Sequence, residues 1–343
     1  MNKILDVVNP PITSYTEIAN LLSVLWLDQD RVLPWLTDHF VQLCAYRRSD
    51  SDIYIGNFLD DVCPYDICLY QICPLIECSK VDRDLFRFKT KNIESEIKDL
   101  LHSGYYLSLI VDLYYISKST HYMKKHSPHP VFIYGYDGDE VMISDFFGKY
   151  IRTSVKITEI LYGIHMNEGV DSWTRNFYVF RINRNTYKLN ITRLVQTLTD
   201  YLQCTNHLTH PEFDDVYHDH EFLYGLKYYD ALIANSNSDN ISIVPFHVNY
   251  DHKVLMQSRI SYLTRKFAGG ANSDNVLLGQ YMKENEILVS EALALRNLVL
   301  KYNSTRKAST LETIKEKCMS LKEREYATYS RILEWIQEHS LID

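Results

Sequence analysis

A histidine and an aspartate stand at the two open ends of a predicted β-hairpin. Between His129 and Asp145 lie two runs, residues 131–136 and 140–144, rich in the β-branched and aromatic side chains typical of strands. An Asp-Gly pair at residues 137–138 joins the runs and is a strong turn signal, because glycine readily adopts a positive φ. A carboxylate beside an imidazole fixes its tautomer and stabilises the imidazolium, which is what a general base requires.

The strand register decides whether these two side chains can meet. If residue 131 lies opposite residue 145, side-chain alternation carries His129 and Asp145 to one face of the hairpin, roughly 5–8 Å apart at Cβ. The apolar residues that share this face are Val131, Ile133, Val141 and Ile143. A slip of one residue would separate the pair, and the alternative is an ordinary hairpin with polar residues at its frayed end.

The composition narrows the class of protein. A chain of 343 residues is long enough for a sizeable core and predicts two domains. The net charge of −8 argues against a broad positively charged surface that would bind nucleic acid or an anionic membrane. The chain has neither a signal-like apolar region at its start nor an apolar run long enough to span a bilayer. Its seven cysteines form no compact disulfide framework, so we expect a cytoplasmic protein.

The segments around the hairpin predict the elements that would position it. Ser14 followed by Glu17 is a capping-box signal for a first helix, and Pro34 would lie in the first turn of a second. The predicted elements in this part of the chain are helices within residues 12–45, 93–101 and 157–164, and strands at residues 53–58, 66–77, 105–116 and 177–182. The strand at residues 105–116 is nearly all apolar, which indicates burial on both faces.

Beyond residue 187 the pattern changes to long helical periodicities. The predicted helices there cover residues 188–203, 220–234, 248–267, 276–302 and 309–340. The whole pattern therefore predicts an α+β protein, with a mixed domain over residues 1–185 and a helical domain over residues 186–343.

Residues 95–150 resemble the N-terminal domain of the butirosin biosynthesis H protein family. In that family a histidine opens a strand that runs into Gly-Tyr-Asp, here residues 135–137, and the next strand ends in a catalytic aspartate or asparagine. His129 and Asp145 occupy those positions. The similarity is looser over residues 10–45 and weak beyond residue 220, where Tyr-Gly-Leu-Lys-Tyr-Tyr-Asp at 224–230 resembles a segment of the family's carboxy-terminal domains. The resemblance implies a papain-like fold for residues 1–185, related to the bacteriocin-processing cysteine peptidases.

The resemblance also implies a function, namely acyl or aminoacyl transfer, or thioester cleavage, in bacterial nonribosomal peptide or polyketide biosynthesis. The expected partners are an acyl or peptidyl carrier protein and a small-molecule acyl acceptor. Phosphopantetheine would enter only as part of the carrier substrate, and no other cofactor and no metal is expected. In the family a cysteine at the start of the first helix attacks the thioester, assisted by the helix dipole and the histidine.

The nucleophile is the open question, because residues 12–17 read Ile-Thr-Ser-Tyr-Thr-Glu and contain no cysteine. Ser14 is the nearest chemical substitute, with His129 as general base and Asp145 as its orienting partner. Alternatively, Ser14 and Glu17 only cap the helix, and His129 deprotonates an incoming amine directly without a covalent intermediate. A different class of function is a catalytically lapsed relative that binds a carrier domain or a small metabolite.

Three other polar groups have competing interpretations. Four cysteines recur every five residues, which is not a zinc spacing and favours free buried thiols: Cys63, Cys68, Cys73 and Cys78. A second cluster is either a set of metal ligands or a solvated loop: His207, His210, Asp214, Asp215, His218 and His220. The loop at residues 121–126, rich in histidine and lysine, could gather the phosphate of a pantetheine arm or simply be exposed.

Overall fold

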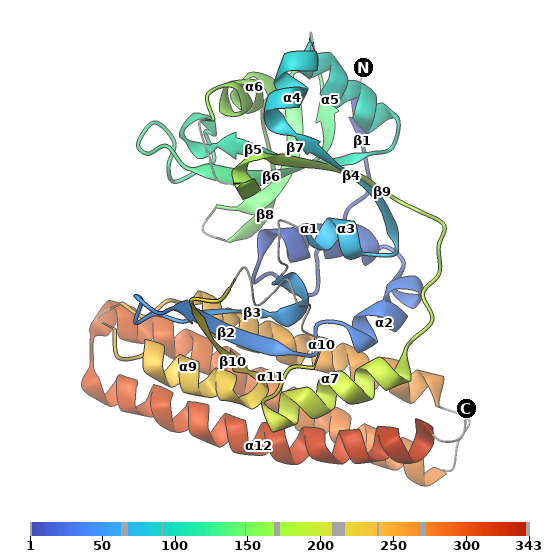
Figure 1. Cartoon of the computed structure of the whole chain (residues 1–343), viewed down its shortest axis with the longest axis vertical. Coiled ribbons are helices and arrows are strands. Elements are labelled where there is room, and N and C mark those ends of the chain that lie inside the picture. Colours follow the sequence, from blue (N-terminus) through green and yellow to red (C-terminus); the bar gives the residue numbers. More distant parts are fainter. Residues whose placement is uncertain are drawn as a thin grey trace. The chain divides into compact units, whose positions relative to one another are not determined.

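The computed structural model is an α+β protein with antiparallel sheets (Figure 1). It describes residues 2–62, 68–90, 92–147, 149–167, 172–207, 217–238, 240–267 and 272–340. The chain forms two compact units. The first unit contains residues 1–29 and 66–186, and the second contains residues 30–65 and 187–343.

The first unit is built on one antiparallel sheet with the strand order β4-β9-β5-β6-β7-β8. In addition, β1 pairs with residues 135–137 at the carboxy-terminal end of β6. The strands are β1 (Asn2–Ile4), β4 (Ile76–Asp82), β5 (Tyr106–Asp112), β6 (Pro128–Asp137), β7 (Glu140–Phe146), β8 (Tyr150–Lys156) and β9 (Asn176–Ile182). Every residue of β5 is buried, because β9 and β6 flank it and helices cover both faces. The prediction that the strand within residues 105–116 is buried on both faces is therefore confirmed, although the strand ends at Asp112.

Two sets of helices cover the two faces of this sheet (Figure 1). On one face lie α4 (Arg83–Lys89), α5 (Ile93–His102) and α6 (Ile157–His165), over a core that includes Ile97, Leu101, Ile160 and Ile164. On the other lie α1 (Thr16–Leu25) and α3 (Leu69–Ile72). There Tyr70 of α3 stacks on Phe180 of β9 with ring centroids 4.8 Å apart. The sheet is thus held between two apolar layers, which fixes the strands that carry the candidate site.

The predicted hairpin is present and has the predicted register at its open end. Phe132 lies opposite Ser144 and Ile133 opposite Ile143, which is the pairing that sets residue 131 against residue 145. The apolar face is confirmed, since its four predicted members share one core cluster: Val131, Ile133, Val141 and Ile143. A β-bulge between Ile133 and Gly135 shifts the register by one nearer the turn. The turn itself has Gly138 at φ +61°.

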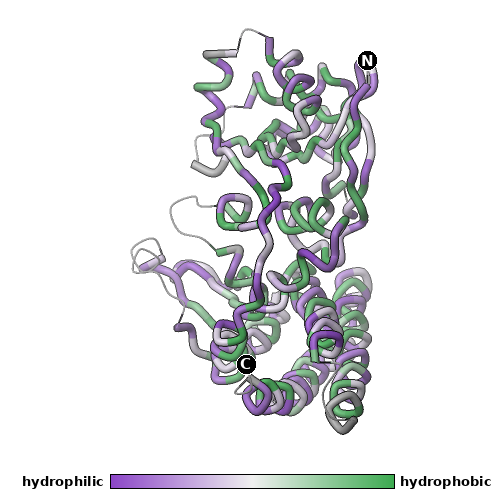
Figure 2. The backbone as a smooth tube through the Cα atoms, turned by 90° about the vertical axis from the view of Figure 1, so that its right-hand side faces the viewer, coloured by the Kyte–Doolittle hydropathy of each residue, from purple (hydrophilic) through white to green (hydrophobic). Residues whose placement is uncertain are grey.

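The second unit contains long helices and a small antiparallel sheet ordered β10-β2-β3. The strands are β2 (Leu43–Arg48), β3 (Ile55–Phe58) and β10 (His220–Tyr224). The helices are α2 (Gln29–Asp38), which begins one residue before the unit, α7 (Ile191–Gln203), α9 (Tyr228–Asn235), α10 (Val244–Lys266), α11 (Asn272–Thr305) and α12 (Ala308–Ser340). Hydrophilic and hydrophobic residues alternate along the long helices (Figure 2). Among the described residues, none of the helices is long and apolar enough to cross a membrane.

A buried ionic network lies at the centre of the second unit. The Lys253 ammonium donates hydrogen bonds to Glu325 Oε1 at 2.6 Å, Asn249 Oδ1 at 2.9 Å and His252 Nδ1 at 3.0 Å. The Glu325 carboxylate also accepts hydrogen bonds from the hydroxyls of Tyr201 and Tyr229. Burial and the neighbouring Lys253 charge lower the pKa of His252 well below its usual value, so this imidazole is neutral. The network satisfies all three ammonium protons, as a buried charge requires.

Several sequence predictions are wrong in this part of the chain. Residues 30–65 pack in the second unit, not in a domain over residues 1–185, because β2 pairs with β10 across the chain. Strand β10 occupies the start of the helix predicted at residues 220–234. The helical segment starts only at Gly225, with a 3-10 turn over Gly225–Lys227 before α9. Gly225 has φ +55° and lies so close to the Tyr201 carbonyl that a Cβ would clash with it.

Other predicted details of the helices are also corrected. Helix α1 begins at Thr16 with Tyr15 as its N-cap residue and no side-chain capping bond, so Ser14 and Glu17 form no capping box. Pro34 lies inside α2, not in its first turn. The predicted strand at residues 66–77 instead contains α3 and only the start of β4.

Candidate functional site

The hairpin brings His129 and Asp145 together in the first unit. Nε2 of His129 at the start of β6 lies 2.8 Å from Oδ1 of Asp145 at the end of β7. The Asp145 side chain is fully buried, whereas 27% of the His129 side chain is exposed. Because an ionised carboxylate can only accept, Nε2 carries the hydrogen and Nδ1 is the ring nitrogen left to take a proton. The imidazole is thus reachable from solvent while its partner is not.

The charges around His129 favour its protonated form. Burial alone would lower the pKa of His129, but the hydrogen bond and charge of Asp145, together with the charge of Glu17, raise it above its usual value. Burial raises the pKa of Asp145 by more than the hydrogen bonds from His129 and from the backbone N–H of Phe146 lower it. Within the described part of the chain, the buried Oδ2 of Asp145 has no hydrogen-bond partner. Both shifts favour the proton-bound form of the pair.

Helix α1 is anchored to β7 and β8 by the side chain of Asn20. Its Oδ1 accepts hydrogen bonds from the Tyr150 hydroxyl at 2.8 Å and from the Ser144 hydroxyl at 3.3 Å. Asn20 is only 1% exposed, and Ser144 directly precedes Asp145 on β7. The polar side of α1 therefore faces the end of β7 that carries the buried carboxylate.

Glu17 is a site residue that the sequence interpretation missed. It lies three residues before Asn20 in the first turn of α1, and residues three apart share a helix face. Burial raises the pKa of the half-buried Glu17 carboxyl, the His129 charge lowers it, and the Asp145 charge raises it further. Glu17 thus lies within electrostatic reach of both members of the pair. The signal that could have revealed it is a polar stripe at a spacing of three, Glu17, Asn20 and Ser23, in an otherwise apolar helix.

Ser14 lies at the same end of α1. It is half-buried and stands two residues before the first helical residue, Thr16. The prediction that Ser14 caps the helix is wrong, because Tyr15 is the N-cap residue. Its role as nucleophile stays a prediction.

The cysteines and the second polar cluster are described only in part. Cys73 is buried and Cys68 and Cys78 are half-buried, all three as thiols outside any disulfide, and burial raises the pKa of Cys78 to about 12. Cys63 lies outside the described residues. Of the second cluster, His210, Asp214 and Asp215 also lie outside them. His207 pairs with Asp200 at 2.5 Å and His220 with Asp219 at 2.7 Å. No group of three or more potential metal ligands occurs in the described ranges.

The loop at residues 121–126 is mostly exposed. Its last histidine, His126, stacks on Tyr114 with ring centroids 4.3 Å apart and pairs with Asp112 at 2.5 Å. One of the two predicted anion-binding histidines is therefore already engaged by a carboxylate.

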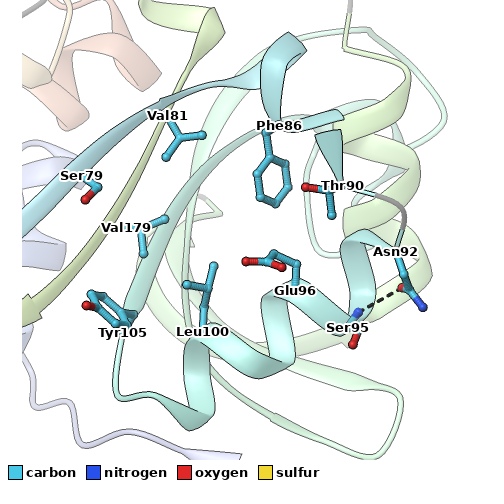
Figure 3. A pocket seen from close by; sticks show the side chains of 10 residues that line it. All are labelled: Ser79, Val81, Phe86, Thr90, Asn92, Ser95, Glu96, Leu100, Tyr105 and Val179. Carbon is cyan, nitrogen blue, oxygen red and sulfur yellow. Dashed lines mark hydrogen bonds between the residues drawn. The ribbon is translucent and has the colours of Figure 1, made fainter. Parts of the chain in front are cut away.

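A pocket of about 690 Å³ lies elsewhere in the first unit, between β4, β9, α4 and α5 (Figure 3). Val81, Phe86 and Val179 form its apolar side, and the Glu96 side chain points toward them. Neither His129 nor Asp145 lines this pocket. It is therefore distinct from the candidate site.

Comparison of the sequence with protein-family models and with curated proteins finds no match.

Proposed function

We propose that the first unit is a papain-like catalytic domain and that the protein is an acyltransferase or a thioester-cleaving enzyme. Its substrate would be an acyl or peptidyl group on a carrier protein, in bacterial nonribosomal peptide or polyketide biosynthesis. The observation that supports this most is the 2.8 Å hydrogen bond between His129, which solvent reaches, and the fully buried Asp145.

Burying a carboxylate costs free energy, and the cost is least when the charge is paired. Among the described residues, the ion-pair partner of Asp145 is an imidazole that remains partly exposed, so the buried charge orients and charges one histidine at a cost in stability. Such perturbed pairs are enriched at functional sites. A hairpin stabilised for its own sake would place an apolar residue at the position of Asp145.

In the proposed mechanism the neutral His129 accepts a proton through Nδ1 from the attacking group. That group is either the Ser14 hydroxyl or the amine of the acceptor. Asp145 stabilises the resulting imidazolium, which then returns the proton to the sulfur of the departing thiol as the acyl C–S bond breaks. The Ser14 route passes through an acyl-enzyme, whereas the amine route joins acyl group and acceptor in one attack.

A second candidate function is a lapsed enzyme that binds a carrier domain or small metabolite. The observation that favours it is the absence of a cysteine at residues 12–17, next to the start of α1, where the resembling family has its nucleophile.

Thiol release separates the two candidates. The full chain is incubated with a panel of acyl-, aminoacyl- and peptidyl-pantetheine thioesters and an amine mixture, and free thiol is followed with a chromogenic disulfide. We expect turnover of at least one thioester, a loss of at least about a hundredfold in His129→Ala, and wild-type rates in His207→Ala. His207 is a matched control, since it also pairs with a buried aspartate but belongs to the second unit. Equal rates in His129→Ala and wild type would refute the mechanism, and binding of a thioester without turnover would favour the lapsed enzyme.

A further inference from the structure

A charged residue interrupts the apolar stripe of α5 where this helix lines the pocket. An apolar stripe that packs on a core recurs at i, i+3, i+4, i+7 and i+8 along a helix. In α5 four of these five positions are apolar and belong to the core of the sheet or pack against it: Ile93, Ile97, Leu100 and Leu101. The position i+3 is Glu96, whose side chain points into the pocket (Figure 3). The helix therefore has a carboxylate where the pattern requires an apolar side chain to cover the sheet, and such local exceptions are expected at functional sites.

The surface that Glu96 faces is apolar. Val81 and Val179, which lie on the paired strands β4 and β9, line the pocket together with Phe86 of α4 (Figure 3). The Phe86 ring packs edge-on against the buried ring of Phe177, with centroids 5.6 Å apart, which fixes the position of this wall. The pocket volume of about 690 Å³ lies within the range of small-molecule sites. A ligand in the pocket would bury an apolar body against the valines and the phenylalanine.

The charge of Glu96 is not balanced by a basic side chain of the described residues. Lys98 of the same helix pairs with Glu94 at 2.5 Å, and Arg181 of β9 pairs with Glu77 at 2.8 Å. The dipole of α5 does not explain the carboxylate at residue 96, because Glu94 already places a negative charge in the first turn. An uncompensated carboxylate above an apolar wall attracts a cation and disfavours an anionic ligand. The pocket therefore combines apolar surface with one negative charge.

We propose that this pocket binds a small organic cation with an aromatic or branched apolar body. The cationic group pairs with the Glu96 carboxylate, and the apolar body lies against the two valines and the phenylalanine. A flat amidinium or guanidinium group suits the site best, because its two parallel N–H groups match the two oxygens of a carboxylate. This binding site is separate from the proposed acyl transfer, since neither His129 nor Asp145 lines the pocket. The bound cation is a ligand and undergoes no reaction there.

Three probes of nearly equal size separate the effect of charge from that of shape. Benzamidinium, benzamide and benzoate are each titrated into the full chain with carbon-13-labelled valine methyl groups, and the signals of Val81 and Val179 are assigned by their loss in Val81→Ile and Val179→Ile. We expect saturable shifts of these signals with benzamidinium, at least about fivefold weaker binding of benzamide and still weaker binding of benzoate. No saturable shift with benzamidinium, or equal affinity for all three probes, would overturn the proposal.

Two substitutions of Glu96 complete the test. Glu96→Gln should weaken benzamidinium binding at least about fivefold. Glu94→Gln is the matched control and should bind like wild type, because Glu94 lies on the same helix but does not line the pocket. Glu96→Leu restores the apolar stripe and fills the pocket, so it should abolish benzamidinium binding and raise the Tm of the protein. Unchanged benzamidinium affinity in Glu96→Gln, or a lower Tm in Glu96→Leu, would show that the carboxylate serves the fold and would refute the proposed site.

Discussion

Replacing Asp145 with asparagine tests the pairing on which the site depends. Asp145→Asn keeps the shape of the side chain but removes the negative charge that lies 2.8 Å from Nε2 of His129. A hydrogen bond to a charged group contributes roughly 1.5–3 kcal/mol, and each pKa unit corresponds to about 1.36 kcal/mol. The pKa of His129 should therefore fall by about one to two units. Burial, which lowers the pKa, then acts against the Glu17 charge alone.

The substitution should also weaken the base. An asparagine that presents its Oδ1 to the Nε2 hydrogen keeps the tautomer, as expected where the resembling family has asparagine, but it stabilises the imidazolium less than a carboxylate does. We therefore expect acyl transfer to fall by about tenfold to a hundredfold. Nitrogen-15 NMR of labelled histidine reports both the tautomer and the pKa. An unchanged His129 pKa in Asp145→Asn would refute the electrostatic account, even if activity were lost.

Two further predictions concern the nucleophile and the second unit. Ser14→Ala should abolish any acyl-enzyme detected by intact-protein mass spectrometry, whereas an adduct that persists would exclude Ser14, and full turnover without any adduct would favour direct attack by the amine. Glu325→Gln should lower the free energy of unfolding, followed by urea denaturation, by about 3–5 kcal/mol, because it leaves the Lys253 ammonium buried and uncompensated. Glu291→Gln, which breaks only the partly exposed ion pair with Arg324, should cost less than about 1 kcal/mol. Equal losses in the two variants would contradict the proposed difference between these ion pairs.

The hairpin could be predicted from sequence because its determinants are local. The Asp-Gly turn and the alternation of apolar residues fix which side chains face the core, and that register places His129 against Asp145. No local sequence feature predicts the bulge between Ile133 and Gly135. It coincides with the close approach of β1, whose Ile4 backbone would lie within 2.8 Å of a Cβ at residue 135.

The small sheet of the second unit could not be predicted because its partners are far apart in sequence. Strand β2 pairs with β10 across more than 170 residues, for example through the Arg47–Glu221 ion pair. Taken alone, residues 220–234 have apolar side chains at helical spacing. Only the pairing with β2 holds residues 220–224 in an extended conformation. The same long-range pairing places residues 30–65 in the second unit.

Glu17 was missed for a different reason. A serine followed three residues later by a glutamate is the signature of a helix cap, and nothing local distinguishes a capping carboxylate from one that faces a site. The distinction requires the position of the whole helix, which depends on Asn20 and its hydrogen bonds to β7 and β8. With α1 starting at Thr16, the Glu17 charge acts on His129 and raises its pKa.

The most direct test of the central claim is the pH dependence of kcat/KM for thioester cleavage. Since the neutral form of His129 is the base, kcat/KM should rise with pH through one apparent pKa above 6.5 that equals the NMR pKa of His129. In Glu17→Gln this apparent pKa should fall together with the NMR value, because a charge that favours the imidazolium is removed. A profile that does not vary with pH, or whose apparent pKa differs from that of His129 and stays fixed in Glu17→Gln, would contradict the assignment of His129 as the general base.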